Sequence, residues 1–385
     1  MQAVGMIAEF NPLHHGHVYA MQQARALGHA DVVVVAMAGN YVQRGEPAIV
    51  DKWARTQAAL AAGADVVVEL PISATVQSAP QFATGGVQLL AALGVTQLAF
   101  GSEDPTVDYA ALAAKLATHQ VAPTTFTDYT QTYATQLNQA VAQVTGAPLS
   151  GPNLLLGLSY AQANLAAGSP LTLLPFGRVG AGHDAPAAGV TASASAVRQA
   201  IAAGEPITQW VPAPSAAQLA ANRHQTWADF YPWLRYRLLT ADLAELRTIA
   251  GMSEGLEYRL TQHIAASHDF PDFLRRIKSK RYTYARLRRL CLAVTLNLTN
   301  ASVAAAQAQP FIHVLGFTAA GQAYLHGVKK TVAWPLVTRV SAAMLAPGGL
   351  LAPQQPGEHL IETLTGRSQN YGRVPVRAES GGSSC

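Results

Sequence analysis

A histidine-containing turn near the N-terminus constrains the fold of this chain more than any other feature. The apolar run Ala3–Ala8 predicts a first β-strand, and Pro12 lies beyond its end because proline has no N–H for a strand ladder. A helical pattern then covers residues 17–27. His14 and His17 are therefore expected at a strand-to-helix turn, where the free N–H groups of a helix start bind anions.

The residues of this turn suit phosphate chemistry. Gly16 has no side chain, so a phosphate can approach the backbone between the two histidines closely. Two imidazoles beside an anion site would stabilise negative charge on a phosphate during its displacement. The spacing H-x-G-H also occurs in turns with two surface histidines, but its place in a strand–turn–helix unit favours an anion site with two imidazoles.

Strands and helices alternate through the first half of the chain. Further strands are predicted at residues 31–38, 65–70, 97–100 and 171–176, with helices at 51–62, at 78–93 and from residue 152. Short connections between such elements are typical of an α/β parallel sheet, in which ligands bind beyond the carboxyl ends of the strands. Polar residues that follow the predicted strands are therefore expected to meet at one rim.

Several of these polar residues are candidate ligand contacts, although each has an ordinary structural explanation as well. Gly101 follows a strand and would let an adenine or ribose lie on the backbone, Asn153 is either a helix cap or a nucleotide contact, and Arg178 is placed to meet a phosphate. The segment after the second strand supplies candidate substrate contacts: Asn40, Gln43, Arg44, Lys52 and Arg55.

Length and composition bound the class of protein. The 385 residues suffice for two domains, predicted as a catalytic domain over 1–205 and a mainly helical, basic domain over 206–385 that ends in a flexible tail. No apolar run reaches the roughly 18 residues of a membrane span, and no signal peptide is recognised, so we expect a cytoplasmic protein. The two cysteines predict neither a disulfide framework nor a metal cluster.

Basic residues gather in the second half, after a proline-containing segment at 206–221 that predicts a linker. Eight lysines and arginines fall within residues 275–289, with Tyr282 and Tyr284 among them. Such a cluster suits an RNA backbone and stacked bases, although a solvated helix face is the alternative. We assign RNA contact to Lys278, Lys280, Arg281, Arg286 and Arg289.

The turn resembles the HIGH signature of the nucleotidyltransferase superfamily. That resemblance implies a Rossmann-like sheet and cleavage of ATP between the α- and β-phosphates. A second superfamily signature, Ser-(Ser/Thr)-x-x-Arg, is matched imperfectly, and it supplies three candidate phosphate contacts: Ser193, Ser195 and Arg198.

The combined motifs are similar to those of one family, the bacterial tRNA(Met) cytidine acetate ligases. The matching stretches include residues 11–17, 38–48, 63–71, 100–103, 152–160, 254–257, 280–286 and 314–317, so the resemblance covers residues 1 to about 340. It implies that acetate and ATP form acetyl-adenylate, and that the acetyl group then passes to N4 of the wobble cytidine of elongator tRNA(Met).

The resemblance also implies a nucleotide site, in which His14 and His17 are catalytic. Its ATP-binding residues are Ile7, Ala8, Glu9, Phe10, Asn11, Pro12, Leu13, His14, His15, Gly16, His17, Val18, Tyr19, Ala20, Gly101, Asn153 and Arg178. ATP is expected to arrive with Mg²⁺, although no dedicated metal cage is visible in the sequence. Two alternatives stay open, a small-molecule adenylyltransferase and a non-catalytic RNA-binding protein with a degenerate nucleotide fold.

Overall fold

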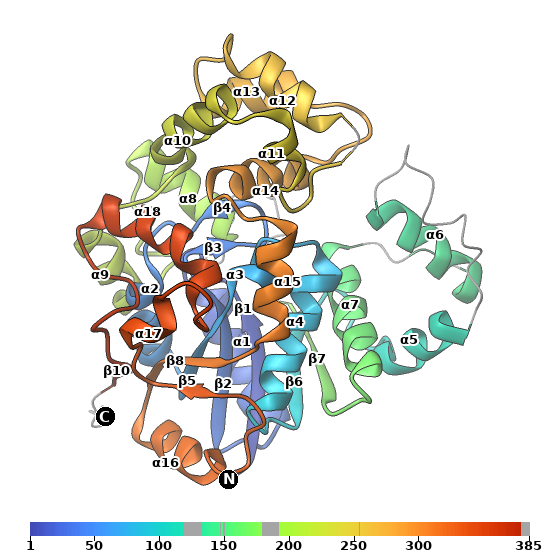
Figure 1. The fold of residues 1–385 in the computed structure, drawn as a ribbon. Coiled ribbons are helices and arrows are strands. Elements are labelled where there is room, and N and C mark those ends of the chain that lie inside the picture. Colours follow the sequence, from blue (N-terminus) through green and yellow to red (C-terminus); the bar gives the residue numbers. More distant parts are fainter. Residues whose placement is uncertain (119–132, 147, 149–150, 179–191, 254, 379–385) are drawn as a thin grey trace.

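A mostly parallel β-sheet forms the centre of the molecule (Figure 1). The computed structural model describes residues 1–118, 133–146, 148, 151–178, 192–253 and 255–378. The strand order is β10-β8-β5-β2-β1-β6-β7, and β9 pairs with β8. The strands of this sheet are β1 (Ala3–Ala8), β2 (Val32–Ala38), β5 (Val66–Leu70), β6 (Gln97–Ser102), β7 (Thr172–Gly177), β8 (Ile312–Phe317), β9 (Leu336–Val337) and β10 (Val376–Arg377).

The central strands are apolar because helices cover both of their faces. Successive side chains of a strand point to opposite faces, and in β2 Val32 and Val34 pack on one side while Val33 and Val35 pack on the other. The first face is covered by α4 (Ala79–Ala92) and α7 (Pro152–Ala166), and the second by α1 (His15–Leu27) and α2 (Lys52–Ala61). This arrangement confirms the predicted α/β parallel sheet.

The position of β1 in the sheet determines where the histidine turn lies. β1 pairs in parallel with β2 and with β6, and β6 pairs in parallel with β7. The carboxyl ends of these strands therefore meet at one rim, as the alternating pattern predicts. A small antiparallel ribbon, β3 (Tyr41–Val42) with β4 (Glu46–Pro47), stands on this rim after β2.

Helices dominate the second half of the chain and form their own apolar core around Phe230, Leu260 and Leu290. In Figure 1 most of this helical layer lies beyond the rim of the sheet, on the side of β3 and β4. Its helices are α10 (Trp227–Thr240), α11 (Leu243–Arg247), α12 (Leu256–Ile264), α13 (Phe270–Ile277), α14 (Tyr284–Thr295) and α15 (Asn300–Ala308).

From residue 312 onward the chain returns to the sheet, which the sequence did not predict. β8 pairs antiparallel with β5 on one edge, and β9 and β10 pair in parallel with its other edge. The remaining helices described are α3 (Ile72–Thr75), α5 (Tyr109–Thr118), α6 (Tyr133–Thr145), α8 (Ala194–Ala203), α9 (Ala213–Ala221), α16 (Ala319–Val328), α17 (Ala342–Leu345), the 3₁₀ helix η2 (Ala352–Gln354) and α18 (Gln355–Thr365).

The predicted linker is partly helical, and most of the predicted flexible tail lies outside the described residues. The segment at 206–221 is not simply a linker, because α9 forms within it and packs against α2. Of the predicted flexible tail only Arg377 and Ala378 belong to the described residues, and Glu254 of the matching stretches lies outside them as well. The domain boundary at residue 206 stays a prediction. Among the described helices, none is both long enough and apolar enough to cross a membrane.

Candidate active site

The two predicted catalytic histidines lie at the start of α1 and fix one another. His14 is the N-cap residue, and its Nδ1 accepts the backbone N–H of Gly16 at 3.1 Å. His17 Nδ1 in turn accepts the backbone N–H of His14 at 3.2 Å. The two rings are stacked, with 3.8 Å between their centroids. Because each Nδ1 accepts a hydrogen bond, each neutral ring carries its proton on Nε2.

The environment of these rings keeps them neutral. Burial lowers the pKa of His14 to about 4, and the positive charge of Arg178 adds to the effect. Burial also lowers the pKa of His17, with His14 and Arg178 as further causes. Near neutral pH both imidazoles are therefore hydrogen-bond donors through Nε2 and do not act as cations.

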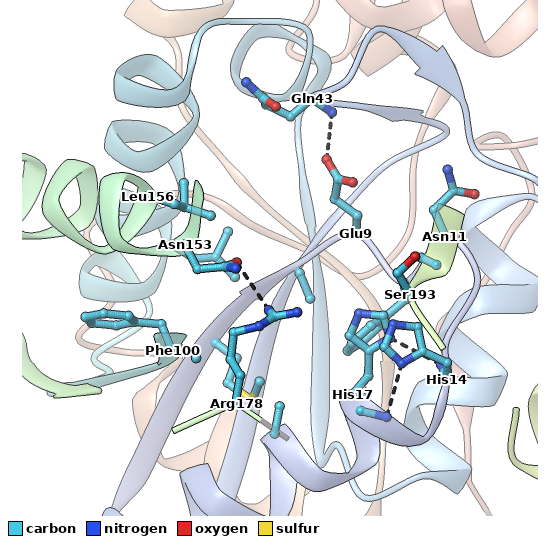
Figure 2. A pocket seen from close by; sticks show the side chains of 18 of the residues that line it. Glu9, Asn11, His14, His17, Gln43, Phe100, Asn153, Leu156, Arg178 and Ser193 are labelled. Carbon is cyan, nitrogen blue, oxygen red and sulfur yellow. Dashed lines mark hydrogen bonds between the residues drawn. The ribbon is translucent and has the colours of Figure 1, made fainter. Parts of the chain in front are cut away.

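Arg178 faces the histidines from the end of β7, which β6 separates from β1, and is oriented by Asn153 (Figure 2). It follows β7 directly, and its guanidinium donates to Asn153 Oδ1 at 3.2 Å. Glu103 orients this asparagine by accepting its side-chain amide at 2.6 Å, and it also accepts the backbone N–H of Leu154 at 2.8 Å. A Cβ at Gly101 would lie 3.1 Å from Arg178 Cγ, so glycine leaves room for the arginine.

These groups line a common cavity of about 300 Å³. The predicted ligand contacts that line it are Ile7, Ala8, Glu9, Phe10, Asn11, His14, Gly16, His17, Tyr19, Ala20, Gln43, Arg44, Gly101, Asn153, Arg178, Ser193, Ser195 and Arg198. Four residues of the predicted nucleotide segment do not line it, namely Pro12, Leu13, His15 and Val18. These four residues belong to the turn and to α1, and they are joined along the backbone to residues that do line the cavity.

Asn11 lines the cavity, but its side-chain amide is fixed and buried. Its Oδ1 accepts the backbone N–H of Ile49 at 2.7 Å, and its Nδ2 is buried without a hydrogen-bond partner among the residues that the structure describes. An unpaired buried N–H group costs roughly 1–3 kcal/mol.

The serine and arginine of the second signature are already partly engaged. Ser193 caps α8, because its hydroxyl accepts the backbone N–H of Ala196 at 3.1 Å. Arg198 donates to the backbone oxygen of Asn11 at 2.6 Å and pairs with Glu46 at 3.0 Å. Both still line the cavity, so a phosphate contact would come in addition to these bonds.

Three of the predicted substrate contacts, Asn40, Lys52 and Arg55, lie beneath the rim and do not line the cavity. Arg55 is 1% exposed, and its guanidinium donates to the backbone oxygens of Glu9, Ala38, Gly39 and Val50. It thus ties the carboxyl ends of β1 and β2 together. The prediction rested on the position of these residues after a strand, and that position does not distinguish a side chain that points into the rim from one that points below it.

Lys52 is the centre of a buried ionic cluster. The side chain is fully buried, and Nζ donates to both oxygens of Glu69 at 2.8 and 2.9 Å, to Glu358 at 3.1 Å and to Asn370 at 2.9 Å. The ammonium group lowers the pKa of Glu69 to about 2, whereas burial raises the pKa of Glu358 to about 7. Asn40 joins through a 2.7 Å bond to Glu358. These contacts attach the C-terminal segment to the rim.

The predicted RNA-binding residues lie on α14 and in the loop between α13 and α14, and their accessibility differs. Lys280 and Arg286 are exposed, and the guanidinium of Arg286 stacks on the ring of Tyr282 with 4.7 Å to its centroid. Tyr282 itself is only 5% exposed, so it supports the cations and is not available for base stacking. Tyr284 is 45% exposed and remains available.

Arg289 connects this basic cluster with the cavity. Its guanidinium donates to the backbone oxygen of Gln43 at 3.1 Å, and the indole N–H of Trp227 donates to the oxygen of Gly45 at 2.9 Å. Gly45 has φ +76°, and a Cβ there would lie 2.2 Å from the backbone nitrogen of Arg289. Glycine is required at this point because the loop after β3 packs directly on the backbone of α14.

Several apolar residues of the cavity wall were not predicted from the sequence. Leu156 and Tyr160 on α7 line the cavity together with Asn153, as do Phe82, Phe100 and Phe176. Asn153, Leu156 and Tyr160 are spaced so that they lie on one face of a helix. Helical periodicity alone would therefore have linked Leu156 and Tyr160 to the candidate Asn153. The three phenylalanines come from separate elements, and no local pattern connects them.

Comparison with known proteins extends the resemblance beyond residue 340. The family described as HIGH Nucleotidyl Transferase matches residues 1–369. The chain is similar to the tRNA(Met) cytidine acetate ligases of Latilactobacillus sakei and Lactobacillus acidophilus, each at 45% identity over 98% of this chain and 97% and 100% of theirs.

Solved structures give the same result at lower sequence identity. The crystal structure of Thermotoga maritima TmcAL in its apo form matches with a TM-score of 0.88 at 26% identity, covering 98% of this chain and 100% of that one. The same protein bound with alpha-thio ATP matches with a TM-score of 0.85 at 26% identity, over 98% and 99% of the two chains.

Proposed function

Because the chain belongs to the tRNA(Met) cytidine acetate ligase family of HIGH nucleotidyltransferases, we propose that it activates acetate with ATP and transfers the acetyl group to N4 of the wobble cytidine of elongator tRNA(Met). The first step would release pyrophosphate and form acetyl-adenylate. The observation that carries this proposal is the pair of neutral, Nδ1-anchored imidazoles facing Arg178 in the cavity. A cytoplasmic location follows from the tRNA substrate and is part of the proposal.

The cavity residues would have separate roles in adenylation. Acetate oxygen attacks the α-phosphorus of ATP, and negative charge grows on the phosphate oxygens in the transition state. The Nε2–H groups of His14 and His17 would donate to these oxygens, and Arg178 would supply a positive charge beside them. Preorganised donors of this kind need no covalent enzyme intermediate.

The adenine and ribose would lie along the opposite part of the cavity. Gly101 lines this part of the cavity, and Phe100, Leu156 and Tyr160 supply apolar surface near Asn153. Mg²⁺ with ATP is part of the proposal. Among the residues that the structure describes, no group of three or more His, Cys, Asp or Glu side chains is placed to hold a metal ion. The phosphates of ATP would therefore be its principal ligands.

Family membership favours the ligase over both alternatives. A small-molecule adenylyltransferase has no use for the basic cluster on α13 and α14, and a degenerate nucleotide fold does not need both His14 and His17 on the cavity wall. We propose that the exposed cations of this cluster, with Tyr284, hold the tRNA.

The direct test of the proposed function uses the full chain with radiolabelled acetate, ATP and unmodified elongator tRNA(Met). We expect label to enter the tRNA only when ATP is present, and digestion to nucleosides should release it as N4-acetylcytidine. A tRNA whose wobble cytidine is replaced by uridine is the matched control, because it lacks the acceptor amine. Label in small-molecule adenylates alone, or none in any product, would contradict the proposal.

The basic cluster can be tested separately from adenylation. Replacing Lys280 and Arg281 together by alanine is expected to weaken tRNA binding and to reduce the slope of log affinity against log salt by up to about 1.5, because two phosphate contacts are lost. Acetate-dependent ATP–pyrophosphate exchange without tRNA should change little. Filter binding at several salt concentrations measures the first quantity.

The control variant removes two positive charges from a surface away from the basic cluster. Lys329 and Lys330 are exposed after α16, at the end of the molecule away from α13 and α14 in Figure 1. The variant with alanine at both positions should bind tRNA as tightly as the parent protein. Equal losses in the two double variants would mean that net charge alone, and not this surface, determines tRNA affinity.

A further inference from the structure

Glu9 carries the only carboxylate among the described residues that line the cavity. It directly follows β1, its side chain is partly exposed, and Oε1 accepts the backbone N–H of Gln43 at 2.8 Å. Figure 2 shows this carboxylate directed to Gln43 and away from Arg178. Adenylation brings further negative charge into the cavity, so a carboxylate in its wall calls for a separate chemical explanation.

The end of the cavity near Glu9 faces the basic helical layer. Gln43 donates to Glu9 through its N–H and accepts from Arg289 of α14 through its backbone oxygen, so one residue separates the carboxylate from the basic cluster. Trp227 holds the same loop through Gly45. An RNA held on this cluster would therefore present a nucleotide to the cavity from the side of Glu9.

Acetyl transfer to an amine requires a group that accepts a proton. The cytidine N4 attacks the acetyl carbon, a C–N bond forms, the bond from that carbon to the phosphate oxygen breaks, and AMP leaves with the electron pair. The nitrogen must lose one proton in this process. His14 and His17 are poorly suited to take it, because their Nδ1 atoms are occupied and their pKa values are lowered by burial.

The surroundings of Glu9 make its carboxylate a stronger base than that of a free glutamate. Burial raises the pKa of its carboxyl group, and the neighbouring Glu46 also raises it, whereas the Gln43 N–H, Arg44 and Arg198 lower it. Tyr160 faces Glu9 from α7, and burial together with this carboxylate raises the pKa of the Tyr160 phenol, so the phenol stays protonated. A carboxylate is also a good partner for the N4 amino group of cytosine, from which it accepts a hydrogen bond.

From this geometry we infer that Glu9 binds the N4 amino group of the acceptor cytidine and takes its proton as the acetyl group is transferred. This role rests on the proposed function and adds to it an acceptor site at the Gln43 end of the cavity. Glu9 is then a catalytic residue of the second step, whereas His14 and His17 serve the first.

The test supplies chemically prepared acetyl-adenylate and unmodified elongator tRNA(Met) to the full chain and measures N4-acetylcytidine in a single turnover. Glu9→Gln keeps the size of the side chain and removes the base, so we expect transfer to slow by about 100-fold or more. Acetate-dependent pyrophosphate exchange, measured on the same preparation, should fall by less than about tenfold. Glu205→Gln, at an exposed position after α8, is the matched control and should behave like the parent.

The pH profile distinguishes a base from a merely structural carboxylate. Transfer by the parent should rise with pH until Glu9 is ionised and then level off, while Glu9→Gln should lack this rise and Glu9→Asp should retain it at a lower rate. Unimpaired transfer by Glu9→Gln, or an equal loss of transfer and exchange, would overturn the inference. A parent chain that catalyses neither step would instead contradict the proposed function, and with it the role of Glu9.

Discussion

Replacing His14 or His17 by alanine is expected to lower acetate-dependent ATP–pyrophosphate exchange by about 100-fold or more, the effect of removing one preorganised donor to a transition-state oxygen. Each variant loses an Nε2–H group that the helix start holds in place through Nδ1. Initial rates at saturating ATP and acetate measure the loss. Wild-type-like rates in both variants would contradict the proposed mechanism.

A third variant separates catalysis from helix capping. His14 is both the N-cap of α1 and a candidate catalytic group. Asparagine is a strongly preferred N-cap residue, so His14→Asn should keep the helix start and the thermal stability of the chain. It does not place a donor where Nε2 lies, and exchange should stay as low as in His14→Ala. Recovery of exchange in His14→Asn would assign the histidine a capping role only.

The lowered pKa values of both histidines also define a pH signature. Since burial brings the pKa of His14 to about 4, the imidazole is already neutral at pH 6 and does not titrate between pH 6 and 8. The exchange rate should therefore show no decline through the ordinary histidine range as the pH rises. A decline with an apparent pKa of about 6.5 would mean that an imidazolium ion is the active form.

The sequence predicted the histidine turn because all of its determinants are local. The strand, the proline, the glycine and the helix pattern occur within 27 residues, and α1 begins only two residues before the predicted start. The parallel direction of the strands near β1 followed from the alternation of strands and helices. Elements whose neighbours are close in sequence leave clear patterns, and these patterns led to the site.

Features that depend on distant residues were not predictable in the same way. β8 pairs with β5 across more than two hundred residues, and its antiparallel direction leaves no trace in either strand alone. Tyr282 and Tyr284 are two positions apart and have similar local surroundings, yet only Tyr284 is exposed, because the packing of α14 on the helical core decides which ring is covered.

Lys52 is the strongest example of a residue whose role depends on partners distant in sequence. Its replacement by methionine is expected to lower the free energy of unfolding by about 3–5 kcal/mol, the usual cost of leaving buried partner charges unpaired. Glu69 and Glu358 would lose their shared cation, and Asn370 would lose a donor. Urea denaturation measures the change. Lys115→Met, at an exposed position on α5, is the control and should change stability little.

The pH dependence of this loss tests its electrostatic cause. Without the ammonium group the folded-state pKa values of Glu69 and Glu358 rise above those of the unfolded chain, so the folded state binds more protons than the unfolded state. Stability of Lys52→Met should then fall as the pH rises from 5 to 8, relative to the parent. Lys52→Met/Glu358→Gln should recover part of the loss, because one buried charge is removed. If Lys52 were a substrate contact, Lys52→Met would keep its stability and show a raised KM for ATP or acetate, and that result would reverse our assignment.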